Sequence, residues 1–431
     1  MEVKVQIVRR ETIKPSSPTP AELRSFKLSL FDQLNPNLYT PLLLYYADCR
    51  NLDQTTGRLK SSLSKTLIHF YPLAGRITNN LSIECNDEGA EFIEAEVGCC
   101  LSDILTRPDA TVLERFLPVQ IYHSNARDAP LLLVQANFFK CGGLVIGACV
   151  SHKLTDAATL STFINAWAGE ARGSREIVLP EYRLSSMFPP VDYLSSLPTV
   201  DMPRTKCITG RFVIQSSRIA ALKARAASDD VPRPTAVEAV TALVWKSAAT
   251  ASWKNSDLRS GPKQTVLAQM VNLRKRVYPP LPNNSAGNMV TYFKAKTEET
   301  ELKLQALVFH LRNGIRERQQ QYIEQLLGEH GVPATLETAR DYGVLLANER
   351  VNFYSCSSWC KFPLYTADFG WGKPTWASVA NAEFKNIIVL MNTPDGEGIE
   401  VWLTLSEADM ALCGHDEELL EFASVNPSAE Y

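Results

Sequence analysis

Several features that mark common protein classes are missing from this 431-residue chain. No run approaches about 18 uninterrupted apolar residues, so no membrane-spanning helix is predicted. The formal net charge is only −3, and no Lys/Arg-rich segment offers a surface for nucleic acid. The N-terminal segment is too charged for the apolar core of a signal peptide, which favours a cytoplasmic location. The chain also lacks internal repeats and low-complexity tracts.

Disulfide and metal-binding patterns are absent as well. The ten cysteines are mostly single, and neither close pair, Cys99 with Cys100 or Cys356 with Cys360, has histidines at metal-ligand spacing. The six histidines are dispersed. Without a secretion signal, the cysteines are expected to be reduced thiols. We therefore expect no metal site.

Length and patterning predict an α/β protein of two similar-sized domains, each a mixed sheet with helices. A chain of this length exceeds one ordinary core, and strand-like segments alternate with helix-like segments in both halves. The expected boundaries are an N-terminal domain over 1–190, a proline-rich linker over 191–210 and a C-terminal domain over 211–431.

Periodicity and turn residues predict the main elements. Helices are expected over 21–34, 57–71, 157–171, 216–227, 234–251, 298–328 and 406–422. Strands are expected over 40–48, 211–214, 265–274, 351–359, 386–393 and 399–405, and on both sides of a turn at 141–143. A β-hairpin is predicted over 81–97, around a turn at 86–89.

One histidine stands at a predicted strand-to-helix junction. The strand LVIGACV ends near His152, and the next helix is expected to start at about Thr155 or Asp156. A side chain there is firmly held yet reachable, and a neutral imidazole can remove a proton from an attacking alcohol. A core histidine that is hydrogen-bonded to the backbone explains the position equally well. Position alone leaves both interpretations open.

Asp156 has a structural interpretation of its own. It precedes the helical segment AATLSTFINAW and could cap that helix, where its carboxylate would accept from free backbone N–H groups. A Ser-His-Asp triad is disfavoured, because the chain contains no G-x-S-x-G elbow. A helix cap is therefore the structural interpretation of Asp156.

A second motif, Asp368-Phe369-Gly370-Trp371-Gly372, predicts a sharply turning loop. Gly370 and Gly372 permit backbone conformations closed to other residues. Trp371, between two glycines, could direct its indole N–H toward another element. In the alternative interpretation, Asp368 is a turn-forming acid and Trp371 is a core aromatic. A protein-kinase meaning of Asp-Phe-Gly is excluded, because the other kinase motifs are missing.

The segments HKLTD and DFGWG, in this order and more than 200 residues apart, resemble the BAHD family of plant acyl-CoA-dependent acyltransferases. The resemblance extends from about Ser16 to the end of the chain. It includes YPLAGR, FINAWA, NLR and GNM, and SSWCKFPLYTADFGWGKP is most similar to the vinorine-synthase-like clade.

This resemblance implies a chloramphenicol-acetyltransferase-like fold with an active-site channel between the domains. It implies acyl-CoA, expected to be acetyl-CoA, as a co-substrate, with no bound cofactor. The acceptor would be the hydroxyl of a hydrophobic plant metabolite, such as an alkaloid, terpenoid or steroid. His152 would be the general base in a ternary complex, and the protein would be a monomer. A catalytically silent ligand-binding homologue and an ester hydrolase are the alternatives.

The resemblance also implies roles for other residues. Asp156 would pair with Arg274, and Asp368 would be held in an ion pair on the glycine-shaped loop. Trp371 would donate its indole N–H to the oxyanion of the tetrahedral intermediate.

The phosphates of coenzyme A require cations. Lys246, on the predicted helix with Trp245, and Lys373, after DFGWG, are candidates. A solvated surface lysine is the favoured interpretation of each.

Overall fold

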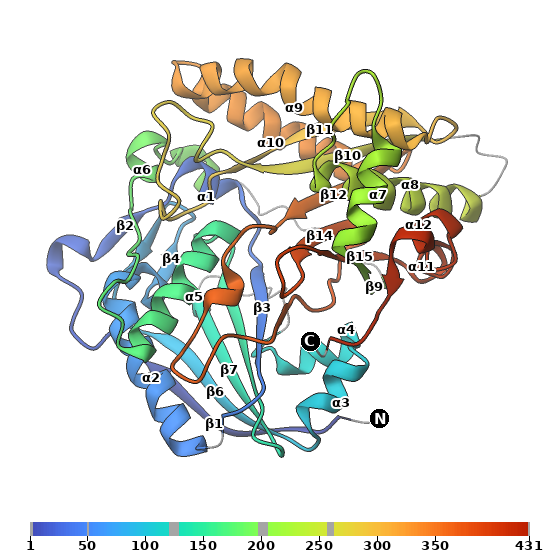
Figure 1. Ribbon diagram of the computed structural model, residues 1–431. Coiled ribbons are helices and arrows are strands. Elements are labelled where there is room, and N and C mark those ends of the chain that lie inside the picture. Colours follow the sequence, from blue (N-terminus) through green and yellow to red (C-terminus); the bar gives the residue numbers. More distant parts are fainter. Residues whose placement is uncertain (1–2, 50, 120–128, 197–205, 257–262, 430–431) are drawn as a thin grey trace.

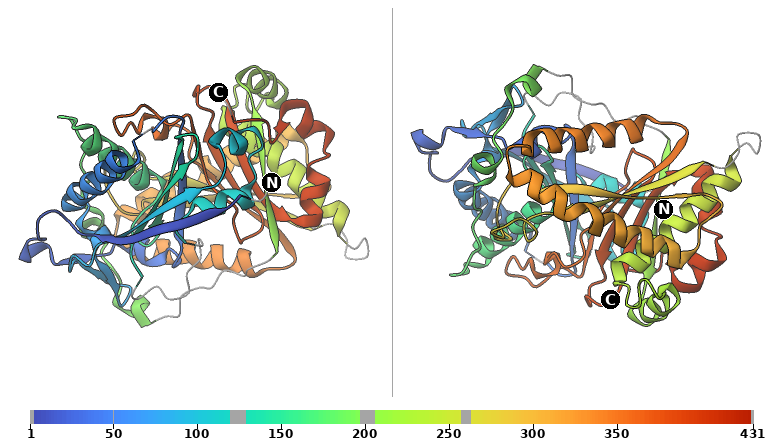
Figure 2. Two further views of the ribbon diagram at one scale, coloured as in Figure 1. Left: turned by 90° about the horizontal axis from the view of Figure 1, so that it is seen from below. Right: turned by 90° about the horizontal axis from the view of Figure 1, so that it is seen from above.

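A computed structural model describes residues 3–49, 51–119, 129–196, 206–256 and 263–429. Two mixed β-sheets, each accompanied by helices, lie next to one another (Figure 1), and two further views show the same pair of layers from below and above (Figure 2). This architecture confirms the predicted α/β class with two mixed sheets.

The first sheet has six strands in the order β1-β6-β7-β8-β3-β13, and β6–β7 is its one parallel pair. Its strands are β1 (Val5–Ile13), β6 (Ala90–Val97), β7 (Leu132–Phe139), β8 (Leu144–Ser151), β3 (Tyr39–Tyr46) and β13 (Trp376–Ser378). Every residue of β7 and β8 is buried. Helices α2 (Leu52–His69) and α5 (Ala157–Arg172) pack against each other, and the indole N–H of Trp167 donates to the backbone oxygen of Leu59 at 3.2 Å.

The second sheet has seven strands in the order β11-β10-β12-β14-β15-β9-β16. They are β11 (Val290–Glu298), β10 (Gln264–Asn272), β12 (Val351–Ser358), β14 (Ile387–Asn392), β15 (Ile399–Ser406), β9 (Cys207–Ile214) and β16 (Ser424–Val425). The helices of this half are α7 (Ser216–Ala226), α8 (Ala236–Asn255), α9 (Leu304–Leu327), α10 (Gly331–Ala347), α11 (Glu407–Cys413) and α12 (Glu417–Phe422). Helix α8 is the central one, with eleven buried residues.

Smaller elements complete the N-terminal half. A three-stranded sheet has the order β2-β5-β4. Its strands are β2 (Ser25–Lys27), β5 (Ser82–Glu84) and β4 (Arg76–Thr78), and the short helices are α1 (Leu30–Leu34), α3 (Leu101–Thr106), α4 (Ala110–Leu113) and α6 (Leu184–Met187).

Two segments of the C-terminal half bind to the N-terminal half. Strand β13 comes from the C-terminal half but pairs with β3 of the first sheet, and the backbone N–H of Ala429 donates to Leu105 O at 2.7 Å. A division at 191–210 therefore does not separate the two sheets completely. The expected linker also contains a 3₁₀ turn over 192–196 and the start of β9 at Cys207, while its residues 197–205 lie outside the described part of the chain.

Two predicted elements are wrong. The helix over 21–34 is instead a 3₁₀ turn, strand β2 and helix α1, because Ser29 forms a capping box with Asp32 and starts the helix there. The hairpin over 81–97 does not form, since β5 pairs with β2 and β4 while β6 pairs with β1 and β7. Asp87 and Gly89, both at positive φ, direct the chain from one sheet to the other.

Two long helices differ from their predicted bounds. The helix expected over 298–328 begins only at Leu304, because β11 continues to Glu298. The last helix, over 406–422, is interrupted after Cys413, where Asp416 caps a new helix. Helix α10 was not predicted, since its first turn contains Gly331 and Pro333.

Close backbone packing beneath the central strands gives a stability prediction. A Cβ atom on Gly147 of β8 would overlap the carbonyl oxygen of Phe116, which belongs to the backbone and cannot rotate away. Gly147→Ala should therefore lower the free energy of unfolding by about 1–3 kcal/mol in urea titrations. The matched change Gly57→Ala, on an exposed turn of α2 with open space, should raise it by about 0.5–1 kcal/mol. Equal effects at the two positions would contradict this packing account.

Candidate active site

His152 follows the last residue of β8 and precedes the turn into α5. Its backbone N–H donates to Leu38 O at 2.8 Å, and its side chain is partly exposed. Its ring nitrogen Nδ1 lies 3.1 Å from Oδ1 of Asn288, which belongs to the C-terminal half. The histidine is therefore held where the two halves of the chain meet.

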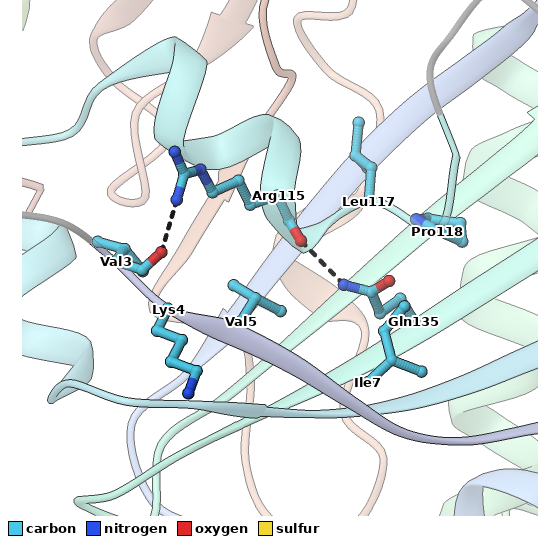
Figure 3. Close-up of a pocket in the computed structure, with 8 residues that line it drawn as sticks. All are labelled: Val3, Lys4, Val5, Ile7, Arg115, Leu117, Pro118 and Gln135. Atoms are coloured by element: carbon cyan, nitrogen blue, oxygen red, sulfur yellow. Dashed lines mark hydrogen bonds between the residues drawn. The ribbon is translucent and has the colours of Figure 1, made fainter.

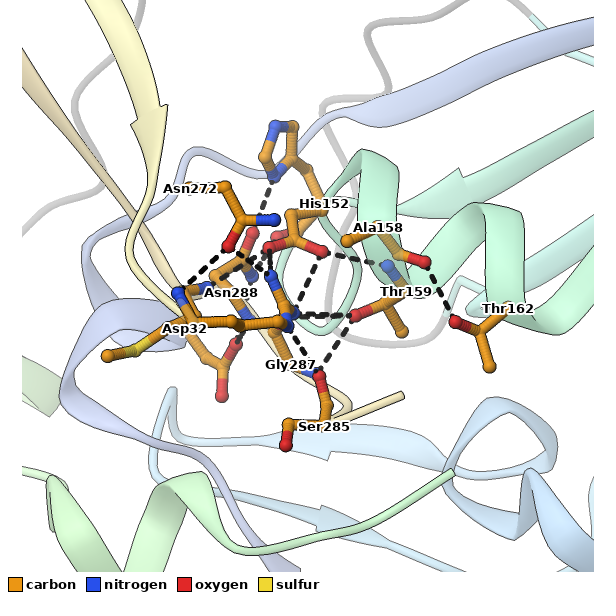
Figure 4. A network of polar contacts seen from close by, with 12 residues as sticks. Asp32, His152, Ala158, Thr159, Thr162, Asn272, Ser285, Gly287 and Asn288 are labelled. Carbon is orange, nitrogen blue, oxygen red and sulfur yellow. Dashed lines mark hydrogen bonds and ion pairs between the residues drawn. The ribbon is translucent and has the colours of Figure 1, made fainter. Parts of the chain in front are cut away.

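The orientation of Asn288 determines which ring nitrogen of His152 carries the proton. Its Nδ2 donates to His152 O at 2.7 Å and to Asp32 Oδ1 at 2.9 Å, and both of these atoms can only accept (Figure 4). Oδ1 of Asn288 must therefore face the imidazole, and an amide oxygen only accepts. Nδ1 of His152 is then the donor, and Nε2 keeps its lone pair.

Asp32 holds this asparagine in place. Its Oδ1 also accepts from the backbone N–H of Asn288 at 2.7 Å, and its Oδ2 accepts from the N–H and the hydroxyl of Ser29 at 2.9 and 2.6 Å. Burial raises the pKa of the Asp32 carboxyl, while these four donors oppose that effect. Four converging donors suit the ionised carboxylate. We call Asp32, Asn288 and His152 the histidine relay.

The environment of His152 favours the neutral imidazole. Burial lowers its pKa below the usual value, and Asp156, Asn288 and Asp32 partly offset this effect. A lowered pKa leaves the ring unprotonated at neutral pH, which a base requires.

Asp156 has two structural functions. Its Oδ1 accepts from the backbone N–H of Thr159 at 2.9 Å and so caps α5. Its Oδ2 lies 2.6 Å from Nη1 of Arg274, in an ion pair that is almost completely buried. Burial alone would raise the pKa of Asp156, but the guanidinium of Arg274 and the backbone donors hold it below the usual value. The expected pair of Asp156 with Arg274 is present.

Arg274 uses its other donors to hold the neighbouring loop. Nε donates to Ser285 O at 2.9 Å, and Nη2 donates to Gly287 O at 2.8 Å. Gly287 has φ +115°, and a Cβ there would press against Leu184, so this position needs glycine. The loop that Arg274 fixes is the one that presents Asn288 to the histidine.

The DFGWG loop lies at a different place. Oδ1 of Asp368 accepts from the backbone N–H groups of Gly370 at 2.8 Å and Gly372 at 3.0 Å, both at positive φ. Its Oδ2 lies 3.5 Å from Nη1 of Arg172 at the end of α5. Burial would raise the pKa of Asp368, but the two N–H groups and Arg172 lower it. Asp368 therefore fixes the loop internally through two backbone N–H groups and connects it to α5 through Arg172.

The contacts of Trp371 give the predicted oxyanion role no support, and that role stays a prediction. Its ring stacks on Phe369 at 5.6 Å and meets Tyr46 edge-on at 6.1 Å. Tyr46 and Tyr39 lie at opposite ends of β3, about 24 Å of strand apart, and Tyr39 pairs with Ser151, the neighbour of His152.

Neither candidate lysine is placed near the histidine relay by its contacts. Lys246 on α8 forms an ion pair with Glu418 on α12, among the helices of the second half. Lys373 is exposed. A role of either lysine in binding coenzyme A stays a prediction without structural support.

Sequence reasoning missed Asn288 and Asp32. Asn288 lies in GNM, a segment noted only as a resemblance, and Asp32 lies in a segment that was predicted as one long helix over 21–34. Long-range hydrogen bonds assemble the relay, and no local spacing signals them.

Three cavities are found in the described part of the first half, one of them of about 220 Å³ beside Arg10 and Arg76. A hollow of about 570 Å³ opens beside β1 (Figure 3), where Arg115 donates to Val3 O at 2.7 Å, and no expected site residue lines it. A cavity of about 20 Å³ is lined in part by Leu38, Tyr39 and Ser151, the residue before His152. This smallest cavity has room for about one water. The expected channel between the domains stays a prediction.

Within the described ranges, no three His, Cys, Asp or Glu side chains are grouped so that they could hold a metal ion. None of the helices in the same part of the chain combines the length and apolar character that a bilayer crossing requires.

Comparison with known proteins identifies the class to which this two-sheet α/β fold belongs, that of acyl-transferring enzymes. The profile of the Transferase family matches residues 3–420. The chain is 38% identical to akuammiline synthase 1 of Alstonia scholaris, over 98% of both chains. It is 37% identical to limonoid 21-O-acetyltransferase of Melia azedarach, over 98% of this chain and 99% of the relative.

A solved structure has the same fold along almost the whole chain. The crystal structure of vinorine synthase superposes with a TM-score of 0.86 at 34% identity, covering 99% of this chain and 100% of the other. The protein belongs to this transferase family, the BAHD acyl-CoA-dependent acyltransferases.

The protonation state of His152 gives a pH prediction. His152 must be neutral to accept a proton, and its pKa is lowered. Activity should therefore be lost as the pH falls through the pKa of His152. The kcat/KM for acyl transfer should therefore be level near pH 7 and fall with an apparent pKa below 6.5, the ordinary value. A pH–rate profile measures this, and an acid limb above pH 6.5 would refute the neutral-imidazole account.

The buried ion pair gives a stability prediction. Asp156→Ala removes a helix cap and leaves the Arg274 charge buried without its partner, so the free energy of unfolding should fall by about 3–5 kcal/mol. Asp416→Ala removes only a cap, that of α12, and should cost about 1 kcal/mol. Urea titrations compare the two. A similar small loss for both variants would show that the ion pair adds nothing.

Proposed function

We propose that His152 is the general base of an acyl transfer from acyl-CoA to the hydroxyl of a hydrophobic plant metabolite. The observation that supports this role is the tautomer: Nδ1 of His152 is committed to Asn288, so Nε2 has a free lone pair on a partly exposed ring. No carboxylate needs to orient the ring of His152, since the side-chain amide of Asn288 does so.

The reaction balances without a covalent enzyme intermediate. Nε2 of His152 takes the proton of the acceptor hydroxyl while the oxygen attacks the thioester carbonyl. The tetrahedral intermediate collapses, and the carbon–sulfur bond breaks. The imidazolium then returns its proton to the sulfur, which leaves an ester and free coenzyme A. Acyl-CoA and the alcohol must both be present, in a ternary complex.

We expect acetyl as the acyl group and an alkaloid, terpenoid or steroid alcohol as the acceptor. One relative is named as an O-acetyltransferase of a limonoid, which supports an acetyl donor and an oxygen acceptor. The acceptor of this chain is a proposal at the level of chemical class. A monomer and a cytoplasmic location stay predictions.

Replacing the base should abolish turnover without unfolding the protein. His152→Ala is expected to lower kcat for acetyl transfer by about 10²–10⁴-fold, the usual contribution of general base catalysis. His415→Ala, at an exposed histidine after α11, should leave kcat unchanged. Release of free thiol from acetyl-CoA, with mass spectrometry of the ester, measures both. Unfolding curves check that each variant is folded.

The same assay separates the proposed function from its alternatives. A panel of alkaloid, terpenoid and steroid alcohols is incubated with acetyl-CoA and with longer and aromatic acyl-CoA donors. Ester formation with thiol release supports a transferase. Cleavage of ester substrates without coenzyme A would identify a hydrolase instead, and saturable binding of alcohols without any turnover would identify a silent homologue.

A further inference from the structure

Lys153, next to His152, is a buried lysine that the proposed reaction does not use. Its side chain is 2% exposed, and Nζ donates to Gln33 O at 2.8 Å and to Asn80 Oδ1 at 2.9 Å. Both partners are neutral oxygens. A buried ammonium with neutral partners has a large desolvation cost, and a nearby opposite charge would offset that cost.

One backbone oxygen and one side-chain oxygen hold this ammonium. Asn79 and Asn80 both have positive φ, 52° and 53°, in the turn between β4 and β5. Asparagine tolerates this conformation better than most residues. Nδ2 of Asn80 also donates to Gln33 O at 3.3 Å, so the two acceptors of Lys153 brace one another.

The nearby opposite charge is Asp32. It directly precedes Gln33 on α1, and its carboxylate is bound only by the neutral donors of Ser29 and Asn288 in the contacts described above. Burial lowers the pKa of Lys153 to about 8, and the charge of Asp32 opposes this effect. Lys153 is therefore mostly protonated at neutral pH, and its positive charge lies close to the relay.

Two carboxylates act on the imidazole of His152, and the structure provides a cation for each. Both Asp156 and Asp32 raise the pKa of the ring, because a negative charge stabilises the imidazolium. Arg274 neutralises Asp156 by direct contact. Lys153 binds the carbonyl oxygen of Gln33, the residue after Asp32, so its charge lies one residue away along α1 and not in direct contact.

We propose that Lys153 is a positioning residue of the acyl-transfer site: its buried ammonium offsets the charge of Asp32 and so keeps the imidazole of His152 neutral in the working pH range. This inference rests on the proposed function, because it assigns Lys153 a role through the general base.

The test compares the protonation of His152 across charge variants. Lys153→Met and Lys153→Gln remove the charge, Lys153→Arg keeps it, and Lys27→Met removes an exposed lysine of β2 as a matched control. NMR titration of ¹⁵N-labelled histidine side chains measures the pKa of His152, whose signals are assigned by their loss in His152→Ala. Unfolding curves identify the variants that fold.

The neutral variants should raise the pKa of His152 by roughly one pH unit, the effect of a charge about 10 Å away at an effective dielectric of about 20. The acid limb of kcat/KM should move to higher pH by the same amount. Lys153→Arg and Lys27→Met should match the wild type. Asp32→Asn combined with Lys153→Met removes both charges and should return the pKa toward its original value.

An unchanged pKa of His152 in folded Lys153→Met or Lys153→Gln would overturn the inference, even if kcat fell equally at every pH. An equal fall of kcat at every pH, with no change in the pKa of His152, is the result expected if Lys153 has only a structural role. The NMR titration needs no substrate, so it remains informative if no acyl transfer is found. Absence of acyl transfer by the wild type would refute the proposed function, while the pKa comparison would still decide whether Lys153 tunes the histidine.

Discussion

The buried ion pair between Asp156 and Arg274 is the interaction on which the rest of the site depends. It joins the start of α5 in one half to the loop after β10 in the other. Through its remaining donors, Arg274 fixes the backbone that presents Asn288, so the partner of His152 is placed by the same contact. Because both charges are buried, the loss of either would leave the other without compensation. The site therefore exists only when the two halves are docked.

The histidine is oriented by an amide, and this choice has a chemical consequence. A carboxylate at Nδ1 would stabilise the imidazolium and raise the pKa of the ring. Asn288 fixes the same tautomer with no net charge, while Asp32 acts one hydrogen bond further away. The arrangement favours a base that accepts a proton from an alcohol and then readily gives it to a thiolate, since a neutral orienting group does not hold the proton on the ring.

The pattern of the sequence predicted those features that depend on contacts between residues close together in the chain. The strand before His152, the cap at Asp156 and the glycine-shaped loop at Asp368 follow from short-range geometry. The relay depends on contacts between residues 136 and 256 positions apart, which no spacing rule reveals. The segment around Asp32 was assigned to one long helix because its apolar spacing fits one, yet the Ser29 capping box starts the helix later.

Balance between acidic and basic side chains explains why several ionisable groups can surround His152, which must stay neutral to act as the proposed base. A single unit charge about 10 Å away, at an effective dielectric of about 20, changes the free energy of the imidazolium by about 1.7 kcal/mol, or just over one pH unit. Two uncompensated acids would therefore raise the pKa of His152 by about two units, which works against the lowering of that pKa by burial. Arg274 beside Asp156, and Lys153 near Asp32, reduce this effect. The acids can then serve as a helix cap and as the support of Asn288 while the histidine keeps its lone pair.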